Sequence, residues 1–459
     1  MKKARHSWYL PALLLASCTL AACSAHDEIL PSGSAVIPSS SWRPGPNGQA
    51  LTASVPEQWW NRFGDPVLTS LVARAVHNNP DMAIAAERVM EARAQMRLSF
   101  SAELPHVEGS GIGIGNGRFS TMEFSQYILG GGLKFDTDLF GRLREQTRAA
   151  KARMLASAAD RDAVELALIG DTVRAYVALQ SSREALTILE HTRDVREAER
   201  IRIAHEVTAG YEKRSSADQA DALVSNAQAQ IAATKLQIAR QEDALAVLLG
   251  DMPNDIDSIA TDGPQLDNIR FPPVIEPVPA RVLANRPDLV EAGDTIIAAD
   301  HSLQSARAAF LPDIVINPGI GTIGGSNPFT GTAWALGGSI LAPIFEGGEL
   351  QANERIARSR RNQAAWAYRK AAIEAFREVE DALAGLTHLA EEEEQVQRAL
   401  YDRQHTLADA RKELRTGYVN YFDVANSEYD ILETTLQRVQ IRAARLGEIA
   451  TLYQATGGK

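Results

Sequence analysis

Hydrophobic residues along this chain recur with two different periods, every three to four positions in some segments and every two in others. The helical period begins near Asp65, after which Leu68, Leu71, Val72 and Val76 recur at spacings of three and four. Such spacing places the apolar side chains on one face of a helix. The pattern therefore predicts an amphipathic helix from about residue 65.

Two much longer segments lack the residues that end helices. Segments 142–209 and 349–416 contain no proline and one glycine each. Each segment predicts a single helix on the order of 100 Å long, at about 1.5 Å per residue. Leu400, Leu407 and Leu414 lie seven residues apart, as in a coiled coil, although Arg403 interrupts this apolar seam. Helices of this length imply coiled-coil packing or a tubular assembly.

The two-residue period occurs in glycine-rich segments that predict β-strands. Between Leu133 and Leu139, apolar side chains alternate with Lys134, Asp136 and Asp138, which is typical of a sheet with one polar face. The candidate strands are His106–Gly117, Gln126–Leu139, Asp313–Gly324 and Thr332–Pro343. Strands of this length and alternation favour an outer-membrane β-barrel, and an ordinary soluble sheet is the alternative. Since four strands cannot close a barrel, a barrel requires further copies of the chain.

The chain contains an internal repeat at an offset of 207 residues. The segment Asn79-Pro80-Asp81 matches Arg286-Pro287-Asp288, and Leu104-Pro105 matches Leu311-Pro312. A repeat this long is a duplicated domain-sized unit rather than a solenoid of short repeats. The predicted fold class is an α+β membrane protein whose two halves each run helix, strand, strand, helical hairpin.

The repeat and the composition of the linking segments set the expected boundaries. We expect a signal peptide at 1–22, an extended arm at 23–60, a first half at 61–252, a proline-rich connector at 253–279 and a second half at 280–459. The predicted hairpins span about 142–250 and 349–456, with tips at 210 and 417, and the predicted strands span about 106–139 and 313–343.

Charge and cysteine content exclude several functional classes. The formal net charge of −11 argues against a nucleic-acid partner, since phosphate binding requires a basic surface. The two cysteines, Cys18 and Cys23, both lie at the N-terminus, so neither a disulfide framework nor a zinc–thiolate site is expected.

The N-terminus has the features of an export signal. Basic residues precede a short apolar run that ends at Ala22, and Leu20-Ala21-Ala22-Cys23 resembles the bacterial lipobox. We expect Cys23 to become the lipidated N-terminus, carrying diacylglycerol and a fatty acyl group. An uncleaved anchor, or cleavage without lipid, is the alternative.

Several motifs together resemble one family. They are Trp59-Trp60 with Phe63-Gly64-Asp65-Pro66 and Leu68, the two Pro-Asp repeats, Asp136-Thr137-Asp138-Leu139-Phe140-Gly141-Arg142, Phe345-Glu346-Gly347-Gly348, and Leu452-Tyr453-Gln454-Ala455 with Gly457-Gly458. The chain resembles the outer-membrane factors of tripartite efflux pumps, the TolC/OprM-like proteins of the NodT lipoprotein group.

This resemblance implies a homotrimer in the outer membrane of a Gram-negative bacterium. Its implied architecture is a twelve-stranded barrel continuous with a long periplasmic α-helical barrel. The implied function is a passive duct for drugs or other small toxic compounds, without cofactors or catalysis. The implied partners are a periplasmic membrane-fusion adaptor, an inner-membrane pump expected to be of the RND type, and outer-membrane lipid.

The resemblance also suggests roles for three residues at the hairpin ends. Gly210 and Gly417 fall at the predicted tips, where glycine permits the positive φ of a tight turn and where adaptor hairpins would dock. Asp423 matches the family's acidic gate residue, and a threefold axis would bring three copies together. Turn formation alone is the alternative for the glycines, and a solvated side chain is the alternative for Asp423. Ser216 and Asn426 depart from the family's acidic pattern, which suggests a weaker constriction.

Other functions fit the sequence less well. It has no His-Glu-x-x-His, no Gly-x-Ser-x-Gly and no phosphate-binding loop, so an enzyme is not expected. Two alternatives remain, a duct for secreted polypeptides and a lipid-anchored coiled-coil protein without a pore.

Overall fold

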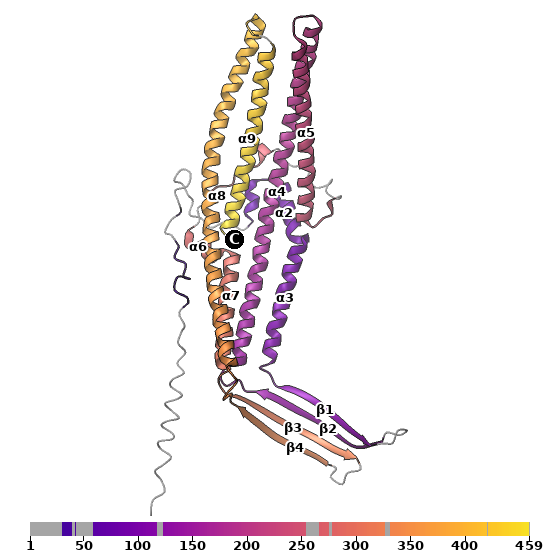
Figure 1. Cartoon of the computed structure of the whole chain (residues 1–459), viewed down its shortest axis with the longest axis vertical. Helices are drawn as coiled ribbons and strands as arrows, with labels where there is room; N and C mark the ends of the chain where they lie inside the picture. The colour runs from indigo at the N-terminus through magenta and orange to yellow at the C-terminus, as the bar shows by residue number, and fades with distance from the viewer. Residues whose placement is uncertain are drawn as a thin grey trace, which may run out of the picture.

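The two proline-free segments form the longest helices of the molecule. In the computed structural model, α4 (Arg142–Thr208) and α8 (Glu349–Thr416) each continue without interruption and turn back into α5 (Arg214–Leu249) and α9 (Tyr421–Ala455). Figure 1 shows the two hairpins rising side by side from the middle of an elongated molecule. The structure describes residues 30–38, 42, 58–116, 123–253, 266–274, 278–325, 331–419 and 421–458.

The two halves repeat the same order of elements. In the first half, α2 (Pro66–Asn78) and α3 (Pro80–Ser101) precede the strands; in the second, α6 (Pro279–Asn285) and α7 (Pro287–Ala308) do so. Helices α3 and α7 each contain 22 residues and begin at equivalent prolines. The duplication predicted from the sequence is therefore present in the fold.

The strands form one antiparallel sheet at the end opposite the hairpin tips. Its order is β1 (His106–Asn116), β2 (Glu123–Asp136), β3 (Asp313–Gly325) and β4 (Gly331–Leu341). Strands β2 and β3 pair across the two halves, so β1 and β4 are the edges. Every residue of β4 is exposed, including Trp334, Leu336 and Ile340. The single chain thus leaves apolar side chains and both sheet edges uncovered.

The predicted C-terminal ends of β2 and β4 lie beyond those in the structure. Strand β2 ends at Asp136 rather than Leu139, and β4 ends at Leu341 rather than Pro343. Asp138 adopts a positive φ of 43°, and its carboxylate accepts hydrogen bonds from the backbone N–H groups of Leu143 and Arg144, both at 2.9 Å. The apparent alternation beyond Asp136 therefore belongs to the cap of α4.

A buried core lies where the hairpins meet the shorter helices. Trp59 and Tyr453 stack with 5.2 Å between ring centroids, joining the segment that precedes α2 to the end of α9. Tyr176 donates a hydrogen bond of 2.6 Å to Asp65, and Asp65 also caps the N-terminus of α2. Trp59, Asp65 and Tyr453, which belong to motifs identified in the sequence, are thus all buried in this region together with Tyr176.

Equivalent glycines close the bases of both hairpins. Gly250 and Gly457 have φ values of +74° and +95°. A Cβ at Gly250 would meet the carbonyl oxygen of Asn78 at 2.5 Å, and a Cβ at Gly457 would meet that of Asn285 at 2.8 Å. Both pairs are related by the 207-residue offset, so the repeat extends to individual backbone contacts.

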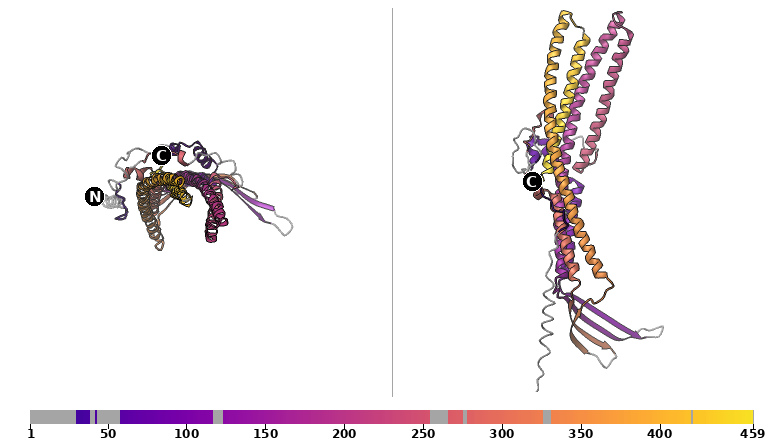
Figure 2. Two further views of the ribbon diagram at one scale, coloured as in Figure 1. Left: turned by 90° about the horizontal axis from the view of Figure 1, so that it is seen from above. Right: turned by 60° about the vertical axis from the view of Figure 1, so that its left-hand side comes forward.

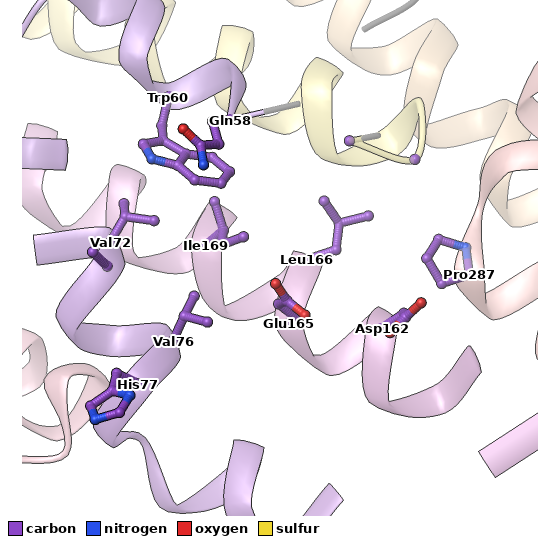
Figure 3. A pocket seen from close by; sticks show the side chains of 13 residues that line it. Gln58, Trp60, Val72, Val76, His77, Asp162, Glu165, Leu166, Ile169 and Pro287 are labelled. Atoms are coloured by element: carbon purple, nitrogen blue, oxygen red, sulfur yellow. The ribbon is translucent and has the colours of Figure 1, made fainter. Parts of the chain in front are cut away.

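A cavity of about 450 Å³ lies between the two halves. Its lining includes Val76 and His77 of α2, Leu166 of α4, Pro287 of α7 and the terminal glycines Gly457 and Gly458. Figure 3 shows the side chains of α2 and α4 facing this space, with Pro287 at its far side. The cavity marks the surface along which the first and second halves meet.

Across the described residues, no helix combines the length and apolar character needed to cross a bilayer.

Candidate functional site at the hairpin tips

Glycines end both long helices with the same backbone geometry. Gly210 and Gly417 have φ values of +81° and +80°, as expected for tight turns. The N–H of Tyr211 donates to the carbonyl of Glu206 at 2.9 Å, and that of Tyr418 donates to Glu413 at 3.0 Å. These bonds span five residues and form the Schellman motif at each helix end.

The space around the tip glycines is open. A Cβ built at either glycine would meet nothing within 4 Å, so the turn requires glycine for its φ and not for close packing. Tyr211 and Tyr418, which follow the glycines, are largely exposed. Each tip therefore presents an aromatic side chain to its surroundings.

Asp423 lies in the first turn of α9, close to the second tip. Its side chain is exposed, whereas the next two residues, Val424 and Ala425, are buried, and Val424 packs against α8. The N-terminal end of a helix favours a carboxylate because the backbone N–H groups there carry partial positive charge. The fold of one chain thus accounts for an acid at this position, while its role as a gate stays a prediction.

The two hairpins touch near their tips through a buried ion pair. Arg196 and Glu199 of α4 form a salt bridge of 2.9 Å, and both side chains are almost fully buried. The Arg196 guanidinium lies 4.2 Å from the centroid of the Tyr429 ring and 3.5 Å from the Asn426 side-chain oxygen, both on α9. One cation therefore joins the first hairpin to the second.

A second contact between the hairpins lies closer to the tips. The Arg202 guanidinium is 4.5 Å from the centroid of the Tyr421 ring, and it also bonds Glu206 at 3.2 Å. A cavity of about 340 Å³ beside this contact is lined by Tyr421, Phe422 and residues of α4 and α5. The start of α9 thus rests on the first hairpin at the same level as Asp423.

The sequence did not single out Arg196 or Glu199, because both belong to a charged stretch typical of a solvated helix face. Their three-residue spacing is a weak signal of a local pair. The decisive partner, Tyr429, is more than 200 positions away. Only the packing of α4 against α9 brings it close.

The apolar seam between α8 and α9 agrees with the heptad pattern. Leu400 and Leu407 are buried, and Leu414 packs against the cluster near the tip. At Arg403 the contact between the helices is polar, because its guanidinium reaches across to the Asp430 carbonyl and the Thr434 hydroxyl, the latter at 2.6 Å. An arginine at this position links the two helices.

At the opposite end of α4, the motif from Asp136 to Arg142 forms the elbow between sheet and helix. Arg142 makes salt bridges of 3.2 Å to Asp136 and 3.1 Å to Asp313. Because Asp136 and Asp313 lie on β2 and β3, one arginine holds the strands of both halves against the first turn of α4. The elbow motif is therefore structural.

The connector packs against the hairpins through charged groups. Asp267 forms salt bridges with Arg438 at 2.8 Å and Arg442 at 3.4 Å. Burial, followed by the nearby charge of Asp267, raises the pKa of Glu184 on α4 above its ordinary value. The described part of the connector, residues 266–274, thus joins α4 to α9 around a partly buried carboxyl.

The described residues of the N-terminal arm, 30–38 and 42, lie along α8. Trp42 packs against Phe376 with 5.6 Å between ring centroids, and the Arg369 guanidinium donates to the carbonyls of Gly33 and Ala35. Cys23, the predicted lipidation site, lies outside the described residues.

Comparison with known proteins agrees with this geometry. The family of outer membrane efflux proteins matches residues 71–251 and 278–458, one segment in each half. The CusC protein of the cation efflux system of Escherichia coli is 31% identical over 409 residues, covering 87% of this chain and 88% of CusC. The outer-membrane protein TtgI of the toluene efflux pump of Pseudomonas putida is 31% identical over 386 residues, covering 80% of this chain and 77% of TtgI.

A solved structure of CusC aligns with a TM-score of 0.76 and 28% identity, covering 90% of this chain and 99% of that structure. The fold class and the family resemblance predicted from the sequence are confirmed, and the matched relatives are outer-membrane channels rather than enzymes. The chain belongs to the outer membrane efflux protein family.

Proposed function

We propose that three copies of this chain form a passive duct, the outer-membrane part of a tripartite efflux pump of the RND type. The observation that supports this most strongly is the open architecture of one chain. Its sheet has two unpaired edge strands, and its helices form an arc when seen along the long axis (Figure 2). Three four-stranded sheets would close a barrel of twelve strands, within the known range for outer-membrane barrels.

The exposed side chains of the sheet suit a lipid-facing surface. Trp334, Leu336 and Ile340 alternate along β4 and are all exposed in the single chain. Outward apolar residues with aromatic residues near the membrane interfaces are typical of outer-membrane barrels. We therefore place the sheet in the outer membrane and the hairpins in the periplasm.

The hairpin tips suit a docking surface for a periplasmic adaptor. Gly210 and Gly417 form equivalent turns, and each is followed by an exposed tyrosine. Exposed tyrosines are enriched at protein interfaces because one side chain supplies both apolar area and a hydrogen bond. The adaptor in turn would connect the duct to an inner-membrane pump.

We infer that the entrance is gated at Asp423. A threefold axis would bring three carboxylates together, where mutual repulsion opposes full ionisation and favours bound cations. The Arg196 contact with Tyr429 would hold α9 against the first hairpin and keep this entrance narrow. Because Asn426 is neutral, the acidic ring would be formed by Asp423 alone.

The cargo is proposed only as small toxic compounds. CusC is named for cation efflux and TtgI for toluene efflux, two chemically unlike cargoes carried by relatives of similar identity to this chain. Such breadth supports a duct that does not select its cargo, with energy and selection supplied by the pump. The described residues also contain no group of three or more His, Cys, Asp or Glu side chains able to hold a metal ion.

The path of the arm supports lipidation of Cys23. Trp42 packs against Phe376, whereas Gly33 lies beside Trp366, ten residues closer to the sheet end of α8, so the described part of the arm runs toward the sheet in the direction of its N-terminus. From Trp366 to the start of α8 is about 26 Å, at about 1.5 Å per residue. The ten residues from Cys23 to Gly33 can extend about 33–36 Å at most. Cys23 can therefore reach the level of the elbow and the membrane surface.

Deletion and complementation would test the proposed function. Loss of the gene should raise intracellular accumulation of a fluorescent efflux substrate and lower resistance to a panel of dyes, solvents and metal ions. Wild-type protein should restore both. If the deletion instead abolishes release of a polypeptide while efflux is unchanged, the secretion duct is the correct reading.

Mass spectrometry of the N-terminal peptide would test the lipid separately. The mature chain should begin at a diacylated or triacylated Cys23, and Cys23→Ser should remove that mass. Recovery of an unmodified N-terminus beginning after a different cleavage site would contradict the lipidation.

A further inference from the structure

Helices and strands of the second half contact more neighbouring elements than their counterparts in the first half. In the second half, α7 packs against both α4 and α8, α9 packs against both α8 and α4, and β3 pairs with both β2 and β4. Among the described residues, the equivalent elements of the first half have one such neighbour: α3 and α5 pack mainly against α4, and β1 pairs with β2.

The missing neighbours can be named from the repeat. Helix α4 is the additional neighbour of α7 and α9, and the repeat relates α4 to α8. Strand β2 is the additional neighbour of β3, and the repeat relates β2 to β4. Figure 1 shows α8 and β4 along one side of the molecule and α3, α5 and β1 along the other. The two sides therefore have matching, unfilled positions that one chain cannot bring together.

We propose that α8 and β4 of one copy dock onto α3, α5 and β1 of the next copy in the register that the two halves use within one chain, with Glu349 facing His106 and Lys134. This surface is called the outer seam here, and the contact of α4 and β2 with α7, α9 and β3 is called the inner seam. The proposal rests on the proposed trimer and assigns the residues and the charge polarity of its interface.

The register is fixed at several points by backbone geometry. Gly141 and Gly348, at the N-termini of α4 and α8, have φ values of +80° and +93°. Strands β1 and β3 begin at His106 and Asp313. Both pairs differ by 207 residues, so Arg142 corresponds to Glu349 and Asp313 corresponds to His106.

The charge arrangement is reversed between the two seams. In the inner seam, the cation of Arg142 on the helix meets the anion of Asp313 on the strand at 3.1 Å. In the outer seam, the helix carries the anion of Glu349 and the strand carries His106. His106 lies directly opposite Lys134 in the pairing of β1 with β2, so their side chains share one face and offer cationic donors to a carboxylate.

A second polar pair follows from the same register. In the inner seam, Arg153 donates to the Ser302 hydroxyl at 2.9 Å. The corresponding residues are Arg360 and Gln95, both exposed in the single chain. The Gln95 amide oxygen can accept from a guanidinium as the serine hydroxyl does. The outer seam would thus keep this hydrogen bond while exchanging its acceptor.

Apolar residues support the burial of the outer seam. Ala149 and Ser305 of the inner seam are only 1% and 6% exposed. Their counterparts are Ile356 and Leu98, which are 48% and 71% exposed in the single chain. Large apolar side chains at positions equivalent to buried ones indicate a surface that another copy covers.

Cross-linking tests the register directly. In the full-length protein isolated from outer membranes, the double variant His106→Cys with Glu349→Cys should give covalent dimers and trimers with a short bismaleimide reagent. The matched control is Arg142→Cys with Asp313→Cys, which should cross-link within one chain and give no higher bands. Wild-type protein treated in the same way controls for Cys23, and each single variant should give no trimer.

The oligomeric state of each sample separates this proposal from the proposed function. Light scattering in detergent should report three chains for wild-type protein and for both double variants. A trimer whose His106 and Glu349 sites do not cross-link would overturn the register while leaving the duct intact. A stable monomer would instead contradict the trimer itself.

A charge exchange provides an independent readout. Glu349→Arg should lower the temperature at which the trimer dissociates in mild detergent, because it opposes His106 and Lys134. Adding His106→Asp should recover most of that loss by recreating the Arg142–Asp313 pair. Equal dissociation temperatures for the single variant and wild type would contradict the contact, even if both proteins fold normally.

Discussion

At the scale of single residues, four glycines with positive φ serve two different purposes. Gly210 and Gly417 have open space around them, whereas Gly250 and Gly457 lie against backbone carbonyls. A non-glycine residue in the left-handed region costs about 1–2 kcal/mol. At Gly250 this strain is joined by a clash with the Asn78 carbonyl oxygen.

We therefore expect Gly250→Ala to lower the melting temperature clearly more than Gly210→Ala does. The tip variant should lose about 1 kcal/mol and the base variant at least about 3 kcal/mol, the level at which strain and overpacking combine. Differential scanning fluorimetry of the purified proteins would measure both. Equal shifts would show that the chain relaxes freely around residue 250.

The buried Tyr176 hydroxyl allows a second residue-level prediction. It donates to Asp65 at 2.6 Å, and burial together with this neighbour raises the pKa of Tyr176. Tyr176→Phe should destabilise the chain by about 1.5–3 kcal/mol, as expected for a hydrogen bond to a charged group. The exposed Tyr401 offers the control Tyr401→Phe, which should change the free energy of unfolding little. Denaturant unfolding would compare the two variants.

Single residues also show where sequence reasoning succeeds. Gly210, Gly417 and the repeated Pro-Asp motifs were identifiable because each carries a local backbone requirement that the sequence states directly. Arg196 was not identifiable, because its environment depends on Tyr429 and Asn426 from another helix. Asp423 was placed near the second tip, and its proposed role depends on copies that one chain does not contain.

At the scale of elements, we expect the contact between the connector and the hairpins to contribute a stability that depends on pH. Because the folded chain raises the pKa of Glu184, it binds this proton more tightly than the unfolded chain does. The stability associated with this proton is fully present below the ordinary glutamate pKa of about 4.3 and is lost as the pH rises through the raised value.

Glu184→Gln should therefore raise the melting temperature at about pH 7 and change it little at about pH 4. The glutamine oxygen can still accept the backbone hydrogen bond from Leu266. Exposed Glu391 gives the matched control Glu391→Gln, which should change the melting temperature little at either pH. A stabilisation by Glu184→Gln that is equal at both pH values would contradict the assignment of burial as its cause.

The contact between hairpins leads to a prediction about channel opening. Arg196→Met should weaken the attachment of α9 to the first hairpin, because it removes both the Glu199 ion pair and the cation–π contact with Tyr429. Single-channel recordings should show larger or more frequent openings than in wild type. The half-buried Arg193, paired with Asp194, provides the control Arg193→Met, which should leave the openings unchanged.

Element types were more predictable than their ends. The absence of proline in two long segments identified α4 and α8, because helix propagation needs an uninterrupted backbone hydrogen-bond ladder. The end of β2 was misplaced, since the alternation of Asp136, Asp138 and Leu139 looks the same in a strand and in a helix cap. The pairing of β2 with β3 could not be derived from the two-residue period of the hydrophobic pattern alone.

At the scale of the whole molecule, the single chain is an arc with complementary sides. The internal repeat predicted two similar halves, and the structure shows that their mutual contact leaves one side of each half uncovered. The sequence indicated that additional copies are needed, because its four predicted strands are too few to close a barrel. The polar pairs proposed for the outer seam could be named only from the observed contacts of the inner seam. The hydrophobic periodicity of the sequence does not predict those contacts.

Single-channel conductance in planar bilayers tests the central claim most directly. Purified mature protein, verified as a folded trimer, should give a small conductance that prefers cations, and Asp423→Ala should increase that conductance. Asp409→Ala, which changes an exposed aspartate of α8 paired with Lys412, serves as the control and should behave as wild type. Absence of conductance from verified trimers of both wild type and Asp423→Ala would contradict the duct and favour a structural role without a pore.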